Sequence, residues 1–377
     1  MADRRSASNA RRISRRRMRR RECLLHERAD LLTDLTLADL GWSEAWAREA
    51  EGEDGTPARV SEVRRDHLIA LSPGGSAELT TSDGAGQYCV GDWILAHGPR
   101  VTLRLSRETE IARRAAGPQA MRQLIAANVD TLAIVTSCNA DFNEARLERY
   151  LAMAAQAGCV PLIVLTKADG VADATDWVRR AETLSPEVRG IALDARDADA
   201  ADALAPWCGP GRTLALVGSS GVGKTTLQNH LTGTDEAVRG IREGDARGRH
   251  TTTARSLRRT LAGGWLIDTP GMRELALTDA GDGIAAVFAD VTDLAAACRF
   301  NDCAHEVEPG CAVQAAIAEG TLDPERLVRW RKLVREDRIA TEGVAVMRAR
   351  TRGTGKAARA STKRGRGRGG FGDDFED

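Results

Sequence analysis

The sequence predicts an α/β protein with three structured parts: a small antiparallel β-barrel, a mostly parallel sheet covered by helices, and a C-terminal helical module. Three observations predict them. Residues 58–107 hold five short β-type runs separated by Gly and Pro, apolar strands alternate with helical segments from Asn128, and three of the eight cysteines follow Asp282. A chain of 377 residues also suits several parts, because single cores rarely grow beyond about 250–300 residues.

The N-terminal third predicts a basic arm followed by the barrel. Apolar residues recur at helical spacing over Leu31–Ala50, so we expect residues 1–57 to form a partly disordered arm with a short helix. Five strands in about fifty residues are typical of a small closed barrel, and an oligonucleotide-binding barrel is expected over 58–112. Residues 113–281 then make the α/β domain and 282–342 the helical module.

Charge is strongly segregated although the whole chain is neutral. Residues 1–21 hold ten Arg and one Asp, and residues 343–377 hold nine Lys or Arg and four acids, so the body at 22–342 carries a net charge of −14. The Gly/Arg-rich end at 343–377 is expected to be disordered. Both basic tails are explained either by solvated disorder or by attraction to RNA phosphates.

The chain shows no signal for a membrane or for export. It has no apolar run of about 20 residues, and the basic N-terminus is not followed by an apolar core. We therefore expect a cytoplasmic, monomeric protein without a membrane partner.

The stretch "GSSGVGKTT" has the composition of a phosphate-binding loop. It follows the apolar strand "TLALV" and opens a helix, so its backbone N–H groups and the helix dipole would face a phosphate. Lys224 would reach the β- and γ-phosphates, and the Thr225 hydroxyl would bind Mg²⁺. The predicted nucleotide-binding residues of this loop are Gly218, Ser219, Ser220, Gly221, Val222, Gly223, Lys224, Thr225 and Thr226.

Two further motifs complete a nucleotide site. In "IDTPG", Asp268 ends a strand and would hold Mg²⁺ through water, while the Gly271 N–H would sense a γ-phosphate. In "TKAD", the Asp169 carboxylate would accept two hydrogen bonds from guanine, and the Lys167 stem would pack over the ring. Thr166 stands at the first position of this motif, and its hydroxyl would serve locally.

The order of these motifs is a cyclic rotation of the usual one. The base-reading motif precedes the phosphate loop, and "GRHTTT" and "DTPG" follow it. A sheet tolerates such a rotation when the old ends lie close together and the new ends fall in exposed loops. The sequence thus predicts a circularly permuted phosphate-loop GTPase domain.

A cluster near the C-terminus predicts a metal site. Cys298, Cys303, His305 and Cys311 lie within fourteen residues. Three thiolates and one imidazole suit a closed, structural Zn²⁺ site. The other five cysteines are expected to be buried residues unrelated to the metal site; they are Cys23, Cys89, Cys138, Cys159 and Cys208.

Over about residues 58–340 the chain resembles the circularly permuted bacterial GTPases of the ribosome small-subunit-dependent GTPase A family (RsgA, also called YjeQ). The resemblance rests on the stretches "LTKAD", "GSSGVGKTTL", "GRHTTT", "DTPGMREL" and "CRFNDCAHEVEPGCAV". It implies a factor that acts late in assembly or maturation of the small ribosomal subunit, binds its rRNA, hydrolyses GTP to GDP when stimulated by the subunit, and is then released.

The resemblance also indicates a catalytic residue and shows one position where this chain differs from the family pattern. Met272 follows Gly271 and cannot orient the attacking water, so His250 is the predicted catalytic residue, with Thr252 or a neighbouring threonine on Mg²⁺ and the γ-phosphate. A solvent-exposed loop histidine is the alternative interpretation. Relatives carry Ser-Ala near the guanine where this chain has Asp194-Ala195, so a guanine contact there stays open.

Two other functions compete with a GTPase switch. One is an RNA-binding structural protein that holds nucleotide without turning it over. The other is a metabolic nucleotide kinase, which "TKAD" and the lack of a recognisable Arg-rich lid disfavour.

Overall fold

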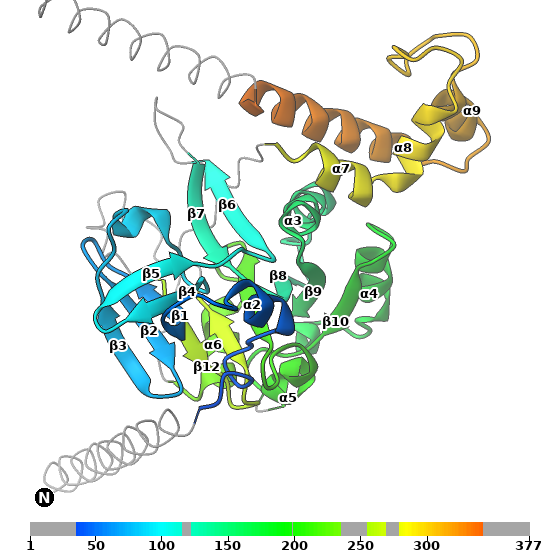
Figure 1. Cartoon of the computed structure of the whole chain (residues 1–377). Coiled ribbons are helices and arrows are strands. Elements are labelled where there is room, and N and C mark those ends of the chain that lie inside the picture. The colour runs from blue at the N-terminus through cyan, green and yellow to red at the C-terminus, as the bar shows by residue number, and fades with distance from the viewer. Residues whose placement is uncertain (1–34, 115–121, 198, 235–254, 269–278, 342–377) are drawn as a thin grey trace, which may run out of the picture. The chain divides into compact units, whose positions relative to one another are not determined.

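The computed structural model describes residues 35–114, 122–197, 199–234, 255–268 and 279–341. They form two compact units, which are best described one at a time (Figure 1). The described residues of the first unit fall within 1–111, 124–144 and 157–273, and those of the second fall within 112–123, 145–156 and 274–377. The second unit is therefore assembled from three separate stretches of chain.

The N-terminal strands of the first unit form a five-stranded antiparallel sheet in the order β3-β2-β1-β4-β5. All five predicted strands are present, and their inward side chains form one apolar cluster that includes Val60, Leu68 and Ile94. The strands are β1 (Thr56–Val63), β2 (Leu68–Ser72), β3 (Gly75–Leu79), β4 (Trp93–His97) and β5 (Arg100–Arg104), with the short helix η1 (Ala85–Gln87) between β3 and β4.

The two edges of this sheet meet at one position, whereas the predicted barrel would require them to pair along their length. The backbones of Thr80, directly after β3, and Arg100, at the start of β5, form an isolated parallel bridge between the two edges of the sheet. Thr80 N donates to Pro99 O at 2.8 Å, and Val101 N donates to Thr80 O at 3.0 Å. The described strands are thus an open sheet with a single edge contact, and an oligonucleotide-binding barrel remains a prediction.

Of the helix predicted over Leu31–Ala50, residues 31–34 lie outside the described residues, and the described part is helical only near its end. Residues from 35 onward turn before α2 (Glu44–Glu49) begins. Gly41 interrupts the helix with φ +87°, a conformation that β-carbon-bearing residues rarely adopt, and a Cβ there would lie 2.7 Å from Gly211 O. Trp42 and Trp46 then pack on Trp93, with ring centroids 4.8 and 5.6 Å from it.

The rest of the first unit is a six-stranded sheet in the order β10-β9-β8-β11-β13-β12, parallel except for the edge strand β12. Its central strands are continuous apolar runs because both of their faces are covered. The strands are β8 (Thr131–Ser137), β9 (Val160–Thr166), β10 (Arg189–Ala192), β11 (Thr213–Gly218), β12 (Leu257–Arg259) and β13 (Trp265–Ile267).

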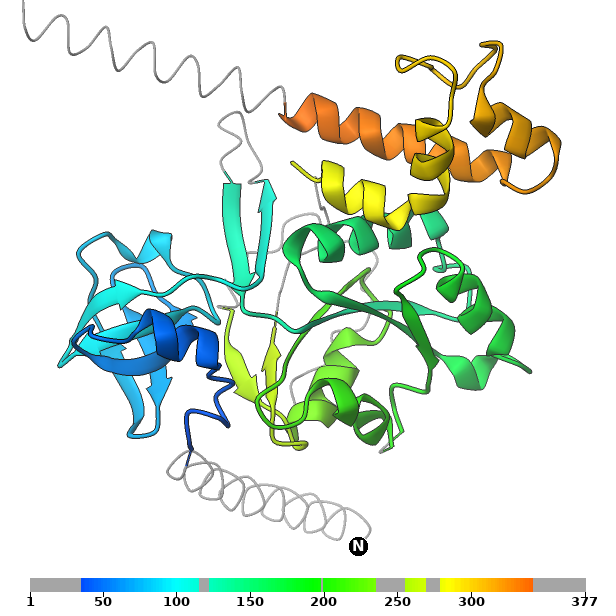
Figure 2. The same cartoon turned by 45° about the vertical axis from the view of Figure 1, so that its right-hand side comes forward.

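Helices α5 (Ala200–Leu204) and α6 (Lys224–Thr232) lie on one side of this sheet (Figures 1 and 2). Leu204, Leu227 and Leu231 pack with Leu214 and Leu266 from the strands. The remaining short elements of the unit are η2 (Ala168–Gly170), α4 (Thr175–Glu182) and η3 (Ala205–Trp207). Because α6 follows β11 without a long connection, the loop between them is held at the carboxyl edge of the parallel strands.

One buried arginine joins the two sheets of the first unit. The Arg59 guanidinium on β1 donates to Leu40 O at 2.7 Å, to Asn128 O at 2.9 Å and to Thr213 Oγ1 at 2.8 Å. Burial lowers the pKa of Arg59 to about 10, so the side chain keeps its charge at neutral pH.

The second unit is helical, as predicted beyond Asp282. Helix α3 (Glu144–Ala157) contributes residues 145–156 to it, and the buried carboxylate of Glu148 accepts hydrogen bonds from Arg326 at 2.8 Å and Arg329 at 2.9 Å. The other helices are α7 (Gly281–Val287), α8 (Ala289–Ala296), α9 (Ala312–Ala318) and a helix that starts at Pro324 and is described as far as Thr341. Strands β6 (Glu110–Arg114) and β7 (Arg122–Ala127) form a separate two-stranded sheet.

Candidate nucleotide site and metal centre

The loop between β11 and α6 has the strand–loop–helix geometry that its sequence predicts. Gly218, Gly221 and Gly223 have φ values of +137°, +79° and +96°. A Cβ on Gly218 would lie 2.1 Å from Val135 O of the neighbouring strand, so glycine is required there. The loop therefore turns tightly enough to present backbone N–H groups at the N-terminus of α6.

Lys224 lies over this loop. Its ammonium donates to Gly218 O at 2.8 Å and to Ser219 O. Ser220 is exposed and Val222 is buried, while Thr225 and Thr226 are half-buried on the first turn of α6. If a phosphate entered the loop, one of its oxygens would replace these carbonyl oxygens as the acceptor for the Lys224 ammonium.

The base-reading motif is fastened to the phosphate loop through Thr166. This fully buried residue ends β9, and its hydroxyl lies 2.6 Å from Val222 O and 2.9 Å from Thr136 O. Lys167 then adopts a left-handed φ of +57°, which turns the chain into η2. The half-exposed carboxylate of Asp169 lies in η2 and contacts Arg196 on the loop after β10.

Asp268 follows β13 and is held by a residue that sequence reasoning missed. The side-chain amide of Gln228, buried on α6, donates to Asp268 Oδ2 at 3.3 Å. This contact brings Asp268 to the helix whose first turn carries Thr225. His250, Thr252 and Gly271 lie outside the described residues.

The loop after β10 also meets the phosphate loop. A Cβ placed on Gly223 would lie 3.2 Å from the Ala195 Cβ, so Ala195 lies within contact distance of the phosphate loop. The neighbouring Asp194 carboxylate binds Arg196 at 2.8–3.2 Å. Arg196 in turn reaches Asp169 Oδ2 at 2.5 Å. No motif pointed to Arg196, because its contact joins residues 27 positions apart.

The predicted metal ligands come together in the second unit. The ligand atoms of Cys298, Cys303, His305 and Cys311 all lie within 4.8 Å of one another. Cys298 Sγ lies 3.8 Å from Cys311 Sγ and 3.5 Å from His305 Nδ1. A tetrahedral Zn²⁺ with Zn–S of about 2.3 Å and Zn–N of about 2.0–2.1 Å requires separations of about 3.8 and 3.5–3.6 Å. The donor set and its spacing fit zinc.

A carboxylate organises the loop between these ligands. Glu308 accepts hydrogen bonds from the backbone N–H groups of Ala304, Glu306 and Val307 at 2.8, 2.8 and 3.1 Å. The Gln314 side chain donates to His305 O, which fixes the backbone of the histidine ligand. Such partners of a ligand loop set the orientation of the ligands.

The remaining described cysteines are structural. Cys89, Cys138, Cys159 and Cys208 are all buried. Burial raises the pKa of Cys159 to about 12 and that of Cys208 to about 11, so both stay protonated and unreactive at neutral pH. Cys23 lies outside the described residues.

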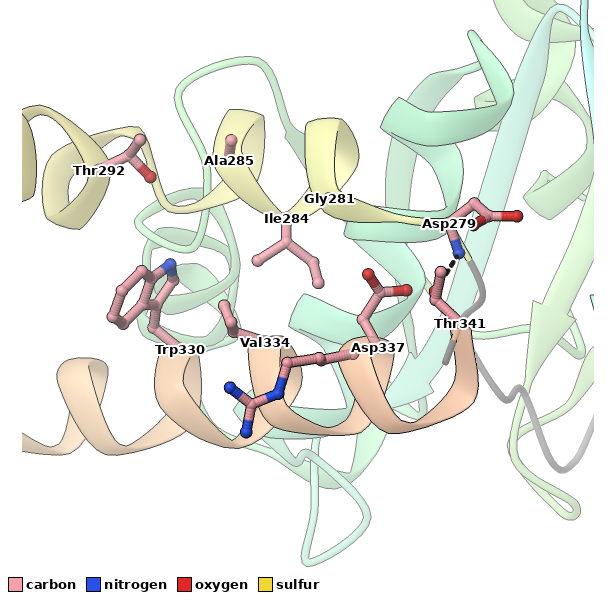
Figure 3. A pocket seen from close by; sticks show the side chains of 10 residues that line it. Asp279, Gly281, Ile284, Ala285, Thr292, Trp330, Val334, Asp337 and Thr341 are labelled. Atoms are coloured by element: carbon pink, nitrogen blue, oxygen red, sulfur yellow. Dashed lines mark hydrogen bonds between the residues drawn. The ribbon is translucent and has the colours of Figure 1, made fainter. Parts of the chain in front are cut away.

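The second unit also contains an apolar groove of about 440 Å³, shown in Figure 3. Ile284 and Trp330 face it from α7 and from the helix that starts at Pro324, and Asp279 N donates to Thr341 Oγ1 at 3.2 Å at one end. None of the residues that line the groove belongs to a nucleotide motif. The phosphate loop and this groove are therefore separate features.

Comparison with known proteins identifies the family of this chain. The family model described as RsgA GTPase matches residues 104–278, the region that holds the three nucleotide motifs. A "Small ribosomal subunit biogenesis GTPase RsgA" from Mesorhizobium japonicum is 54% identical over 316 residues, which cover 81% of this chain and 91% of the relative. The chain belongs to the RsgA GTPase family. A second relative of this family, "RsgA 2" from Vibrio vulnificus, is 43% identical over 86% of this chain and 94% of its own length.

Solved structures of similar fold agree with the permuted order of the motifs. YjeQ from Thermotoga maritima has a TM-score of 0.56 at 20% identity and covers 74% of this chain and 98% of its own. YloQ, titled a circularly permuted GTPase, has a TM-score of 0.53 at 19% identity and covers 76% and 96%. The RsgA chain described here thus has the circularly permuted GTPase fold. Within its described part, no helix combines the length and the hydropathy that crossing a bilayer would require.

Proposed function

We propose that this RsgA family member hydrolyses GTP as a late assembly or maturation factor of the small ribosomal subunit. The observation that carries the proposal is the 54% identity, over 91% of its length, to a relative named for small ribosomal subunit biogenesis. In this proposal the subunit stimulates hydrolysis of GTP to GDP and phosphate, and the factor leaves the subunit afterwards. The ordered phosphate loop before α6 supports a nucleotide-dependent step.

The nucleotide roles follow from the positions of the side chains. The loop from Gly218 to Gly223 would bind phosphates through its N–H groups, and Lys224 would neutralise the β- and γ-phosphates. Mg²⁺ bound with GTP would neutralise charge that develops on the phosphates. Thr225 and Asp268 would hold that ion, and the contact of Asp268 with α6 through Gln228 supports this pairing.

The γ-phosphate and the base would be recognised by the remaining motif residues. Asp169 would accept the two guanine donors, with the Lys167 stem over the ring and Thr166 fixing the motif to the loop. We propose Thr252 and Gly271 as γ-phosphate contacts and His250 as the residue that places the attacking water.

The C-terminal cluster would hold one structural Zn²⁺. Three thiolates and one imidazole leave no open position on a tetrahedral ion, so the metal would stabilise the module and take no part in hydrolysis. The exposed loop between the ligands would then be rigid enough to serve as a contact surface.

RNA contact would be divided among several parts of the chain. We propose an arm at 1–57, an oligonucleotide-binding module at 58–112, the GTPase domain at 113–281, the zinc module at 282–342 and a basic tail at 343–377. The single bridge between Thr80 and Arg100 supports closure of the five-stranded sheet into a barrel.

We also propose that the protein is a cytoplasmic monomer and that it binds the rRNA of the small subunit in this form.

GTP turnover with and without purified small ribosomal subunits tests the proposed function. We expect slow intrinsic turnover and a large acceleration by small subunits, and no comparable acceleration by large subunits. Turnover that small subunits leave unchanged, with tight subunit binding retained, would instead identify an RNA-binding structural protein that only holds nucleotide. Phosphate transfer to a nucleotide acceptor would identify a kinase.

A further inference from the structure

The guanine-reading carboxylate has a support on the neighbouring loop. Arg196 Nη2 donates to Asp169 Oδ2 at 2.5 Å. The same guanidinium is anchored on Asp194, with Nε at 3.0 and 3.2 Å from the two carboxylate oxygens and Nη2 at 2.8 Å from Oδ2. The backbone N–H of Arg196 adds a fourth bond to Asp194 Oδ1, at 3.0 Å.

This arrangement fixes the direction of the guanidinium. A planar guanidinium that donates through two of its nitrogens to one carboxylate has little freedom left for its remaining edge. Asp194 is only 14% exposed, so the anchor belongs to the rigid part of the loop, whereas Arg196 is 70% exposed. Hydrogen bonds from Arg196 lower the pKa of Asp194, which keeps this anchor ionised at neutral pH.

The support also explains why an aspartate can follow β10 here. Two carboxylates that faced the same base edge would repel each other and could not both accept from guanine. Arg196 lies between Asp194 and Asp169 and neutralises both. We therefore expect Asp194 to bind Arg196 and not to contact guanine directly.

We propose that Arg196, anchored by Asp194, is a positioning residue that orients the Asp169 carboxylate for guanine and thereby sets base specificity. This inference rests on the proposed role of Asp169. One oxygen of Asp169 is held by Arg196, and a carboxylate oxygen can accept a second hydrogen bond, so both oxygens remain available to the N1–H and 2-amino groups of guanine. Without Arg196 the half-exposed carboxylate would rotate freely and lose the bidentate geometry.

The test compares the binding of GTP and inosine triphosphate, which lacks the 2-amino group. We expect Arg196→Ala to weaken GTP about two- to fivefold, as for loss of a surface ion pair, and to weaken inosine triphosphate less. The preference for GTP over inosine triphosphate should fall by a similar factor. Asp194→Asn, which weakens the anchor of the guanidinium, should shift the preference in the same direction. Arg196→Lys should fail to restore it, because an ammonium cannot bridge both carboxylates.

Two comparisons separate this proposal from its alternatives. Arg179→Ala is the matched control, because Arg179 is 73% exposed and paired with Asp176 on α4 at 2.6 Å. Arg196→Ala should have no further effect in an Asp169→Asn background, since the two residues act together. Tighter GTP binding by Arg196→Ala would mean that the arginine blocks the site, and an effect no larger than that of Arg179→Ala would mean that it is incidental; either result overturns the proposal.

The Asp169→Asn variant by itself tests the underlying assignment. It should lose GTP affinity and gain affinity for xanthosine triphosphate, because the amide offers a donor where xanthine carries a carbonyl. If Asp169→Asn behaves this way while Arg196→Ala is silent, the positioning role alone is wrong. Unchanged GTP affinity in Asp169→Asn would overturn the guanine-reading role and the positioning role together.

Discussion

The Thr166 hydroxyl connects the base-reading motif to the phosphate loop with one short hydrogen bond to Val222 O, at 2.6 Å. Thr166→Val keeps the shape of the side chain and removes the buried hydroxyl that donates to Val222 O and Thr136 O. We expect a loss of about 1–2 kcal/mol in the free energy of unfolding, measured by urea denaturation, and weaker GTP binding.

Thr183→Val is the control for this change, because the Thr183 hydroxyl makes a similar bond to Arg180 O at 2.9 Å at an exposed helix end. Its effect should stay within about 0.5 kcal/mol. A Thr166→Val protein that matched this control in both stability and GTP affinity would show that the hydroxyl does not connect the two motifs.

His250 is the residue on which the proposed chemistry depends most, and it lies outside the described residues. Since the Met272 side chain cannot orient a water molecule, a neutral imidazole is the group in "GRHTTT" suited to accept a proton or a hydrogen bond from that water. We expect His250→Ala to keep GTP affinity and small-subunit binding and to lose most of the stimulated turnover in a phosphate-release assay.

The result of that assay has two informative alternatives. Stimulated turnover at the parental rate would remove His250 from catalysis. Loss of subunit binding, with intrinsic turnover unchanged, would make His250 an RNA contact instead.

Among the elements, β1 is tied to the six-stranded sheet by Arg59. Arg59→Ala would leave Leu40 O and Asn128 O without their donor and would remove a guanidinium that lies 5.7 Å from the Trp93 ring centroid. At about 1–3 kcal/mol for each of these two unsatisfied buried groups, we expect urea denaturation to show a loss of about 2–6 kcal/mol. Arg48→Ala, an exposed change on α2, should cost less than about 0.5 kcal/mol, and equal losses in the two variants would contradict the joining role.

The helical module should depend on the proposed zinc ion for its stability. Apparent zinc binding of about 10–16 kcal/mol in comparable small sites is folding free energy, so Cys303→Ala should lose the metal and loosen the residues after 282. Elemental analysis and limited proteolysis would measure both effects. GTP affinity should change little, because the nucleotide motifs lie in the other unit.

Cys208→Ala serves as the control for the zinc module, because Cys208 is buried in the core of the first unit and belongs to no cluster of potential metal ligands among the described residues. It should retain a full complement of zinc. Stoichiometric metal in Cys303→Ala, or little metal in freshly purified parental protein, would argue against the site.

The elements that could be predicted from sequence are those whose pattern is local. The strands β8, β9 and β11 are continuous apolar runs, and the phosphate loop and the Cys/His cluster have fixed spacings. By contrast, β10 and β12 are short, and each takes its place only by pairing with a neighbouring strand. Gln228 and Arg196 were missed for the same reason, since their contacts with Asp268 and Asp169 exist only after the chain has folded.

At the scale of the whole molecule, the distribution of charge indicates that attraction to RNA and control of the lifetime of the complex belong to different parts of the chain. The body at 22–342 carries a net charge of −14 and would be repelled by RNA, whereas both tails are basic. The tails lie outside the described residues. Long-range attraction to the small subunit would thus fall to the tails, and the nucleotide site would set how long the complex lasts.

Removing residues 1–21 tests this division. The segment carries ten Arg and one Asp, and each phosphate contact that it makes should contribute about 0.7–0.9 to the slope of log K against log salt. We expect the truncated protein to bind rRNA with a flatter salt dependence, measured by filter binding between low and physiological salt, while intrinsic GTP turnover stays the same. A second variant with the ten arginines changed to glutamine keeps the length of the arm and should flatten the slope equally. An identical slope in all three proteins would mean that the arm does not touch RNA, and attraction would then have to come from the tail at 343–377 or from the five-stranded sheet.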